Sequence, residues 1–200
     1  MSDCARPLDP SIGFALLAAG RGRRFGDGKL AADLGGMPLW RWAARCAERA
    51  GFTTRYLIVA GEGALPRTED AVGWQQAVNP RADEGISTSI QLACRLAADC
   101  DRLVLGLADM PFVEASHLRQ IALEDGVVFT RYPSGRNGVP AGFPNSEFAT
   151  LAGVRGDRGA ASLDWTMPVE SCSAPPDSLM DVDRQADLHL ARARLERESN

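Results

Sequence analysis

The stretch IGFALLAAGRGRRFGDGK, residues 12–29, decides the fold, because an apolar run passes directly into a loop rich in glycine and arginine. Ile12 to Ala18 is short, apolar and uncharged, which predicts a buried strand. The positions from Leu17 to Lys29 hold four glycines, three arginines and a lysine. Glycine lets a backbone approach a ligand closely, and cations neutralise phosphate charge. The loop therefore predicts an anion site, the alternative being a turn that carries solvated arginines.

Two known phosphate-binding motifs match this loop poorly. A P-loop has Ser or Thr after its lysine, whereas Leu30 follows Lys29 here. Gly20, Gly22 and Gly26 approach a dinucleotide fingerprint, with one residue too many before the last glycine.

Outward from this stretch, apolar runs alternate with helical patterns along the chain. The alternation predicts an α/β fold in which helices cover both faces of a mostly parallel sheet. We expect one domain over residues 1–200, with residues 1–10 as a disordered tail. Leu103 to Ala108 is expected to be the central strand, and residues 133–142 a long functional loop. Further strands are expected at residues 55–60, 74–78, 127–132 and 167–172, and helices at residues 38–50, 86–98, around 118–122 and from 184 onward.

Composition excludes several classes of protein. The net charge of −4 and the isoelectric point near 5.3 argue against nucleic acid or an anionic membrane as the main partner. The five cysteines include no Cys-x-x-Cys pair, which favours reduced thiols over a disulfide framework or a zinc site. No apolar run approaches the length of a membrane span or a signal segment. A cytoplasmic protein is expected.

Aspartates follow two of the expected strands. Asp109 comes directly after the central strand, where open parallel sheets bind their ligands. Asp181 and Asp183 follow the last strand, and either could act with Asp109. Mg²⁺ takes one or two protein carboxylates and completes its shell with water and substrate phosphates. The pattern predicts a magnesium site, although a solvated aspartate or a helix cap is the plainer alternative for each.

Taken together, these motifs resemble the molybdenum cofactor nucleotidyltransferase family, and within it the cytidylyltransferase branch, from about residue 12 to residue 190. The opening signature is Leu-Ala-Ala-Gly, with Arg24, Gly26 and Lys29 at the family's spacing, then LGGMPL at residues 34–39. Further matching pieces are Asn79-Pro80, EGISTS at residues 84–89, Asp109-Met110-Pro111, GDRGA at residues 156–160 and Asp181-Val182-Asp183. Ala-Ala-Gly at residues 18–20, in place of Ala-Gly-Gly, is similar to the cytidine branch.

The resemblance implies a Rossmann-like three-layer fold of the nucleotide-diphospho-sugar transferase type. It also implies Mg²⁺-dependent transfer of CMP from CTP to the phosphate of molybdopterin, with release of pyrophosphate. The catalytic residues would be Lys29, Arg24 and Asp109, and the metal ligands Asp109 and Asp183. The implied nucleotide-binding residues are Leu17, Ala18, Ala19, Gly20, Arg21, Gly22, Lys29, Asn79, Gly85, Ser87 and Ser89. A transient contact with a molybdoenzyme or its chaperone is a further implication.

One departure from the family leaves the acceptor open. The family often has Gly-His-Pro near the acceptor, whereas this chain has Val139 between Gly138 and Pro140. Another phosphorylated acceptor, such as a sugar or polyol phosphate, is therefore an alternative. A dinucleotide-binding oxidoreductase is a less favoured alternative, because Ala60-Gly61 stands before Glu62 at the strand end where an acidic residue would hold the ribose. A non-catalytic nucleotide sensor is the remaining alternative.

Overall fold

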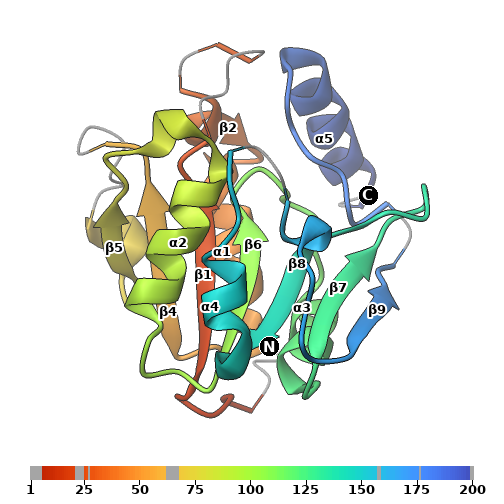
Figure 1. Cartoon of the computed structure of the whole chain (residues 1–200). Coiled ribbons are helices and arrows are strands. Elements are labelled where there is room, and N and C mark those ends of the chain that lie inside the picture. Colours follow the sequence, from red (N-terminus) through yellow and green to blue (C-terminus); the bar gives the residue numbers. More distant parts are fainter. Residues whose placement is uncertain are drawn as a thin grey trace.

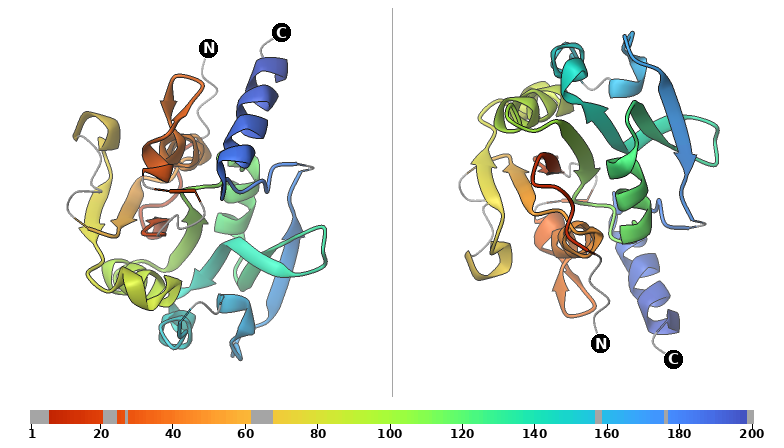
Figure 2. Two further views of the ribbon diagram at one scale, coloured as in Figure 1. Left: turned by 90° about the horizontal axis from the view of Figure 1, so that it is seen from above. Right: turned by 90° about the horizontal axis from the view of Figure 1, so that it is seen from below.

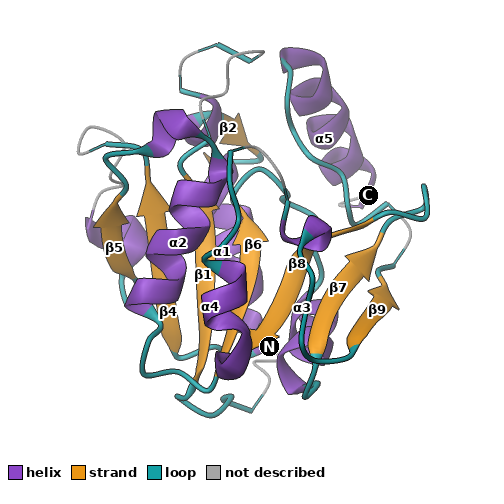
Figure 3. Ribbon diagram, in the orientation of Figure 1, coloured by secondary structure: helices purple, strands orange, loops and turns teal. Residues whose placement is uncertain are grey.

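The computed structural model describes residues 6–20, 25–26, 28–61, 68–156, 159–175 and 177–198. In this part of the chain, a seven-stranded sheet lies between two layers of helices (Figures 1 and 3). This arrangement confirms the predicted α/β fold with a mostly parallel sheet. The strands of this sheet are β1 (Ile12–Ala18), β4 (Thr54–Val59), β5 (Gln75–Val78), β6 (Arg102–Leu107), β7 (Val127–Arg131), β8 (Asn137–Pro144) and β9 (Val169–Ser173). The α-helices are α1 (Leu39–Ala50), α2 (Ile86–Leu96), α3 (Ala115–Leu123), α4 (Phe148–Leu151) and α5 (Gln185–Glu198).

The strands follow the order β5-β4-β1-β6-β8-β7-β9, so β6 is the central strand, as predicted. β5, β4, β1 and β6 run parallel to one another, β8 is antiparallel to both of its neighbours, and β9 is parallel to β7. Ala18 pairs with Val59 and Leu17 with Leu107, so these strands end almost level. The residues that follow them consequently share one edge of the sheet.

The prediction of a loop over residues 133–142 is wrong from Asn137 onward, because β8 begins at that residue. Its glycines and prolines concealed the strand, yet two of the glycines stand where neighbouring side chains press on the backbone. A Cβ at Gly138 would lie 2.8 Å from the ring of Tyr132, and one at Gly142 would lie 2.5 Å from the guanidinium of Arg102. These glycines provide room for packing and do not mark a turn.

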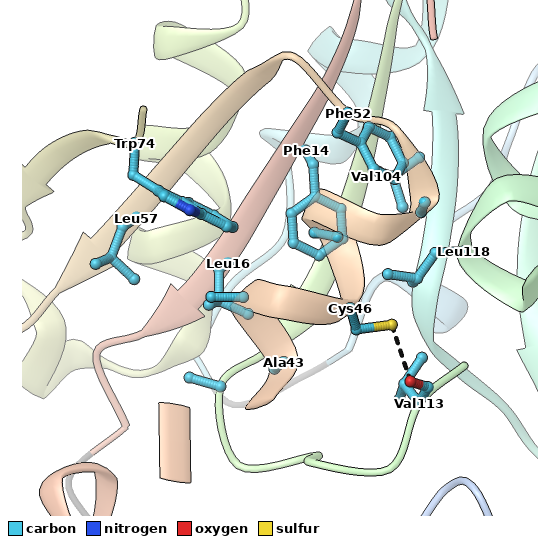
Figure 4. Packing of buried hydrophobic residues seen from close by; sticks show 14 of the residues in the cluster. Phe14, Leu16, Ala43, Cys46, Phe52, Leu57, Trp74, Val104, Val113 and Leu118 are labelled. Carbon is cyan, nitrogen blue, oxygen red and sulfur yellow. Dashed lines mark hydrogen bonds between the residues drawn. The ribbon is translucent and has the colours of Figure 1, made fainter. Parts of the chain in front are cut away.

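Alternate side chains of β1 point to opposite faces of the sheet. Phe14 and Leu16 join the core beneath α1 and α3, where the rings of Phe14 and Phe52 lie 5.0 Å apart between centroids (Figure 4). Within the same core the Cys46 thiol donates to the main-chain oxygen of Val113 at 2.8 Å. Leu17 belongs to the opposite core, beneath α2 and α4. Burial on both faces explains why the strand is continuously apolar.

A third apolar cluster lies under α5, beyond the end of the sheet. Leu188 and Ala191 of α5 pack there with Val182 and with Leu34, which belongs to a short hairpin. The hairpin consists of β2 (Asp33–Leu34) and β3 (Met37–Pro38). The guanidinium of Arg192 also donates to the main-chain oxygen of Asp33, at 2.6 and 3.1 Å. The C-terminal helix is thereby fastened to the β2–β3 hairpin.

The N-terminal segment differs from the expected disordered tail in its described part, residues 6–10. The N–H of Leu8 donates to the oxygen of Gly51 at 2.8 Å, and its side chain is buried. Arg119 donates to the oxygen of Arg6 at 2.7 Å. An apolar side chain and two hydrogen bonds hold residues 6–10 against the rest of the domain.

Among the helices described, none has the length and apolar character needed to cross a membrane.

Candidate active site

The carboxyl ends of the parallel strands bring together residues that are far apart in the sequence. Ala19 and Gly20 follow β1, and Asn79 follows β5. Asp109 is the second residue after the end of β6. Figure 2, left, looks down on this edge, where the N-terminal part of α5 also lies. The N–H of Ala108 donates to the oxygen of Leu17 at 3.2 Å, which ties the end of β1 to the residue before Asp109.

Lys29 forms the centre of this edge. Its ammonium donates to Asp109 Oδ2 at 2.7 Å and to Asp183 Oδ1 at 2.9 Å. The lysine side chain is 9% exposed, while the carboxylates of Asp109 and Asp183 are 23% and 45% exposed, so the ammonium is buried and Asp183 is the most accessible of the three groups. The structure thus brings together three of the residues expected in the catalytic and metal sites.

The sequence positions these groups by short local devices. Gly28, with φ of 78°, turns the chain into a single turn of 3₁₀ helix, Lys29–Ala31, that begins on the lysine. The Asp187 carboxylate accepts the N–H groups of Asp183 at 3.0 Å and Arg184 at 2.7 Å where α5 begins. A carboxylate at a helix start satisfies unpaired donors, so it fixes the chain at Asp183.

Electrostatics keep this site charged. Burial alone would lower the pKa of Lys29, but the attraction and hydrogen bonds of Asp109 and Asp183 outweigh it and raise the pKa above its usual value. Partial burial raises the pKa of Asp181, and repulsion from Asp183 and Asp109 adds to that rise. The ammonium therefore remains protonated at neutral pH. It is Asp183, of the two candidate aspartates, whose carboxylate contacts the lysine.

The carboxylates fit a hard divalent cation. Asp109 uses Oδ2 for Lys29, while its Oδ1 is buried and has no hydrogen-bond partner within the described residues. A buried carboxylate oxygen without a donor is costly, and a cation would satisfy it. Within the same residues, no cluster of three or more His, Cys, Asp or Glu side chains could hold a metal. An ion here would consequently rely on two carboxylates, with its remaining ligands from water or substrate, as Mg²⁺ does.

A second group of expected residues surrounds the start of α2. The Asn79 side chain is buried, and its amide donates to Thr88 Oγ1 and Ser89 Oγ, both at 2.9 Å. Its Oδ1 accepts the N–H of Arg81 at 3.0 Å. Asn79 and Ser89 thus hold the turn before α2 together. Gly85, with φ of 109°, lies in that turn, where a side chain would be strained.

The remaining expected residues fall into three groups. Leu17, Ala18 and Ala19 are buried at the end of β1, whereas Gly20 is exposed, and a Cβ there would meet no atom of the described residues within 4 Å. Ser87 is buried, and its N–H donates to the oxygen of Gly156 at 3.2 Å, which connects two of the motifs. The residues expected in the middle of the first loop, namely Arg21, Gly22 and Arg24, lie outside the described part of the chain.

Tyr132 is a residue of this region that the sequence pattern did not single out. Its hydroxyl donates to the main-chain oxygen of Val139 at 2.6 Å. Burial, followed by the charges of Asp181 and Asp109, raises its pKa to about 12, so the phenol stays protonated beside the carboxylates. The ring also lines a cavity of about 1060 Å³ between α5 and the ends of β7 and β9. A tyrosine at a strand end gives no sequence signal of such a position.

The sheet and its flanking helices belong to a nucleotidyltransferase of the nucleotide-diphospho-sugar transferase fold. Residues 14–167 match the family described as the MobA-like NTP transferase domain. The chain belongs to that family, which confirms the resemblance found in the sequence.

Solved structures agree with this assignment. Rv0371c from Mycobacterium tuberculosis H37Rv is 25% identical over 91% of this chain and 97% of that one, with a TM-score of 0.75. A complex of the same mycobacterial protein with manganese is 25% identical over 91% of this chain and 98% of its own, with a TM-score of 0.74. Molybdopterin-guanine dinucleotide biosynthesis protein A from Archaeoglobus fulgidus is 18% identical over 92% and 99% of the two chains, with a TM-score of 0.70. No curated protein sequence matches the chain.

Proposed function

We propose that this protein transfers a CMP group from CTP to the phosphate of a molybdopterin-type acceptor in the cytoplasm and releases pyrophosphate. Residues 1–200 would act as one nucleotidyltransferase domain. The observation that carries the proposal is the Lys29 ammonium, held at 2.7 Å from Asp109 and 2.9 Å from Asp183 at the ligand-binding edge of the sheet. The name of the Archaeoglobus neighbour supports a molybdopterin-type acceptor.

In this reaction the bond between the α-phosphorus of CTP and the α–β bridging oxygen breaks. A phosphate oxygen of the acceptor forms the new bond to that phosphorus, and pyrophosphate leaves with the electron pair of the broken bond. A phosphate monoester has a second pKa of about 6, so the acceptor is largely ionised at neutral pH and needs no strong general base. The protein's task is to align two anionic groups and to neutralise their charge.

The residues of the edge divide this task. Lys29, together with Arg24, would neutralise the charge that develops on the phosphates. Asp109 and Asp183 would hold Mg²⁺, which when bound supplies further neutralisation of the triphosphate. The loop at residues 17–22 would wrap the triphosphate. The turn at Gly85 with Ser87 would line the base site, while Asn79 and Ser89 hold that turn in place.

An alternative acceptor is a sugar or polyol phosphate. It is favoured by the segment of β8 that faces Tyr132, because Val139 stands there in place of the histidine that the family often has. A molybdopterin product would be passed to a molybdoenzyme or its chaperone, whereas a sugar or polyol product would not.

Pyrophosphate release tests the proposal directly. The assay would use CTP, GTP, ATP and UTP with magnesium, each with molybdopterin, a sugar phosphate or a polyol phosphate. We expect release with CTP and molybdopterin that falls by about 10²- to 10³-fold in Asp109→Asn, the loss typical of removing one charge-stabilising group. Asp99→Asn, which changes an exposed aspartate on another surface, is the matched control.

Other outcomes would replace the proposal. A preference for a sugar or polyol phosphate would replace the acceptor, and a preference for GTP would replace the donor. Tight triphosphate binding without release for any acceptor would favour a non-catalytic sensor. Saturable NADH binding without triphosphate binding would favour an oxidoreductase.

A further inference from the structure

Lys29 is the sole lysine of this chain, because every other Lys or Arg position is an arginine. It is also the group that occupies the space between the two carboxylates proposed to hold a metal. A single Nζ atom lies 2.7 Å from Asp109 Oδ2 and 2.9 Å from Asp183 Oδ1. The residue that would bind phosphate therefore also fills the metal position.

A metal and this ammonium exclude each other at these oxygens. Mg²⁺ binds its oxygen ligands at about 2.0–2.1 Å in a nearly octahedral shell. An ion that used Asp109 Oδ2 and Asp183 Oδ1 would need the position that the Lys29 nitrogen now occupies. The two positive charges would also repel each other. An ion at the buried Asp109 Oδ1 would still lie beside the positive charge of Lys29, so the ammonium must leave before the two carboxylates can bind the ion favourably.

We propose that Lys29 keeps the metal site closed until a triphosphate arrives. The anionic phosphates draw the ammonium away from Asp109 and Asp183, and the freed carboxylates then accept the divalent ion. This inference rests on the proposed function for the identity of the triphosphate, but it concerns the order of binding and not turnover.

Lysine suits such a device better than arginine. Its ammonium is a compact charge on a flexible four-carbon stem, whereas a guanidinium forms a planar, two-pronged pair with a carboxylate that is harder to break. A chain that uses arginine at its other strongly basic positions has lysine at the one that must change partners. Asp183 is 45% exposed, so an incoming anion has access from its side of the pair.

The proposal predicts mutual dependence of the two ligands. If the triphosphate tightens metal binding by some factor, then metal tightens triphosphate binding by the same factor. Removing the ammonium should open the metal site without any nucleotide, and should weaken this coupling to the part that comes from direct contact between the ion and the phosphates.

The first test uses Mn²⁺ alone as the probe, with the free ion counted by electron paramagnetic resonance. We expect Lys29→Met to bind Mn²⁺ roughly 10-fold more tightly than the wild type, a factor within the usual range for coupled sites. Arg95→Met removes an equal charge from an exposed position on α2 and should leave the affinity unchanged. Equal affinity in Lys29→Met and the wild type would overturn the proposal, and so would a lack of Mn²⁺ binding by both.

The second test leaves the protein unmutated, so it does not depend on whether a variant folds. Selective ¹³C-labelling of lysine gives one side-chain signal, because Lys29 is the sole lysine. With EDTA present, addition of an α,β-methylene analogue of CTP should shift this signal, and Mn²⁺ added after the EDTA has been removed should broaden it. A signal that binding of the analogue leaves unmoved would contradict the proposal.

These tests separate the two proposals. Tighter Mn²⁺ binding in Lys29→Met, with no pyrophosphate release by the wild type for any acceptor, keeps the closed metal site and rejects the transferase reaction. Pyrophosphate release from CTP by the wild type, with unchanged Mn²⁺ affinity in Lys29→Met, keeps the transferase reaction and rejects the closed metal site.

Discussion

The main-chain oxygen of Asp109 accepts a 2.9 Å hydrogen bond from the N–H of Val182. This bond joins the residue beyond the central strand to the segment that leads into α5. Because the Val182 side chain is completely buried under α5, the bond cannot shift without disturbing that cluster. The carboxylates of Asp109 and Asp183 are consequently carried by one rigid junction, although they lie far apart in the sequence.

Asp183→Asn tests the chemistry of this junction. The amide keeps the size of the side chain but loses the charge, so we expect pyrophosphate release to fall by about 10²- to 10³-fold. Because the side chain is 45% exposed, the free energy of unfolding should change little. Steady-state kinetics and urea unfolding measure the two effects, with Asp99→Asn as the control. Unchanged kinetics would remove Asp183 from the site.

Asn79→Ala should weaken the turn before α2. The change removes two donated hydrogen bonds and one accepted bond from a buried position. We expect a loss of about 1–3 kcal/mol in the free energy of unfolding, because buried partners are left unsatisfied. Affinity for CTP should fall as well, since Gly85 lies in that turn. Urea unfolding measures the free energy of unfolding, with Asn137→Ala, a change at an exposed asparagine, as the control. Equal losses of unfolding free energy in the two variants would contradict this role of Asn79.

Gly142→Ala should destabilise the antiparallel half of the sheet. The new Cβ would lie 2.5 Å from Arg102 Nη2 and 2.8 Å from Ile121 Cγ2. Arg102 is buried there and donates to main-chain oxygens near the end of α3, so it has little room to move. Overpacking of this kind costs about 1–3 kcal/mol.

The matched control for this glycine is Gly159→Ala, whose Cβ would meet no atom within 4 Å in the part of the chain that the structure describes. It should remain within about 0.5 kcal/mol of the wild type. Equal thermal midpoints for the two variants would show that β8 is not packed as described.

His117 should make stability depend on pH. Its Nε2 lies 2.8 Å from Thr130 Oγ1, whose own hydroxyl donates to the oxygen of Pro140 at 2.6 Å, so the histidine is the donor of that pair. Burial lowers the pKa of His117, although Glu114 opposes the shift weakly. Below about pH 6.5 the unfolded chain therefore takes up a proton more readily than the folded one, and stability falls as pH decreases.

His117→Gln should flatten this dependence between about pH 5 and 7, because glutamine does not titrate there. His189→Gln, at an exposed position of α5, should keep the wild-type slope. Unfolding by urea at a series of pH values measures both. An unaltered slope in His117→Gln would assign the dependence to other groups.

Much of the fold was readable from local patterns. The run from Ile12 to Ala18 is buried on both faces, and such a strand leaves no polar alternation to mistake for anything else. β6 was identified as central for the same reason. β8 is absent from the sequence-based prediction, because its glycines make room for the side chains of Tyr132 and Arg102. These side chains come from other elements, and no local pattern records such contacts.

The sequence by itself determined the class of fold, the edge of the sheet at which the site residues were expected, and the presence of Asp109, Asp183 and Lys29, because periodicity and motif spacing are properties of the chain. Only the tertiary structure decided that Lys29 lies between the two carboxylates. It alone placed Tyr132 beside them and gave Asn79 a scaffolding position. The physical reason is that distances between side chains on different strands depend on packing and on long-range hydrogen bonds, such as that from Val182 to Asp109.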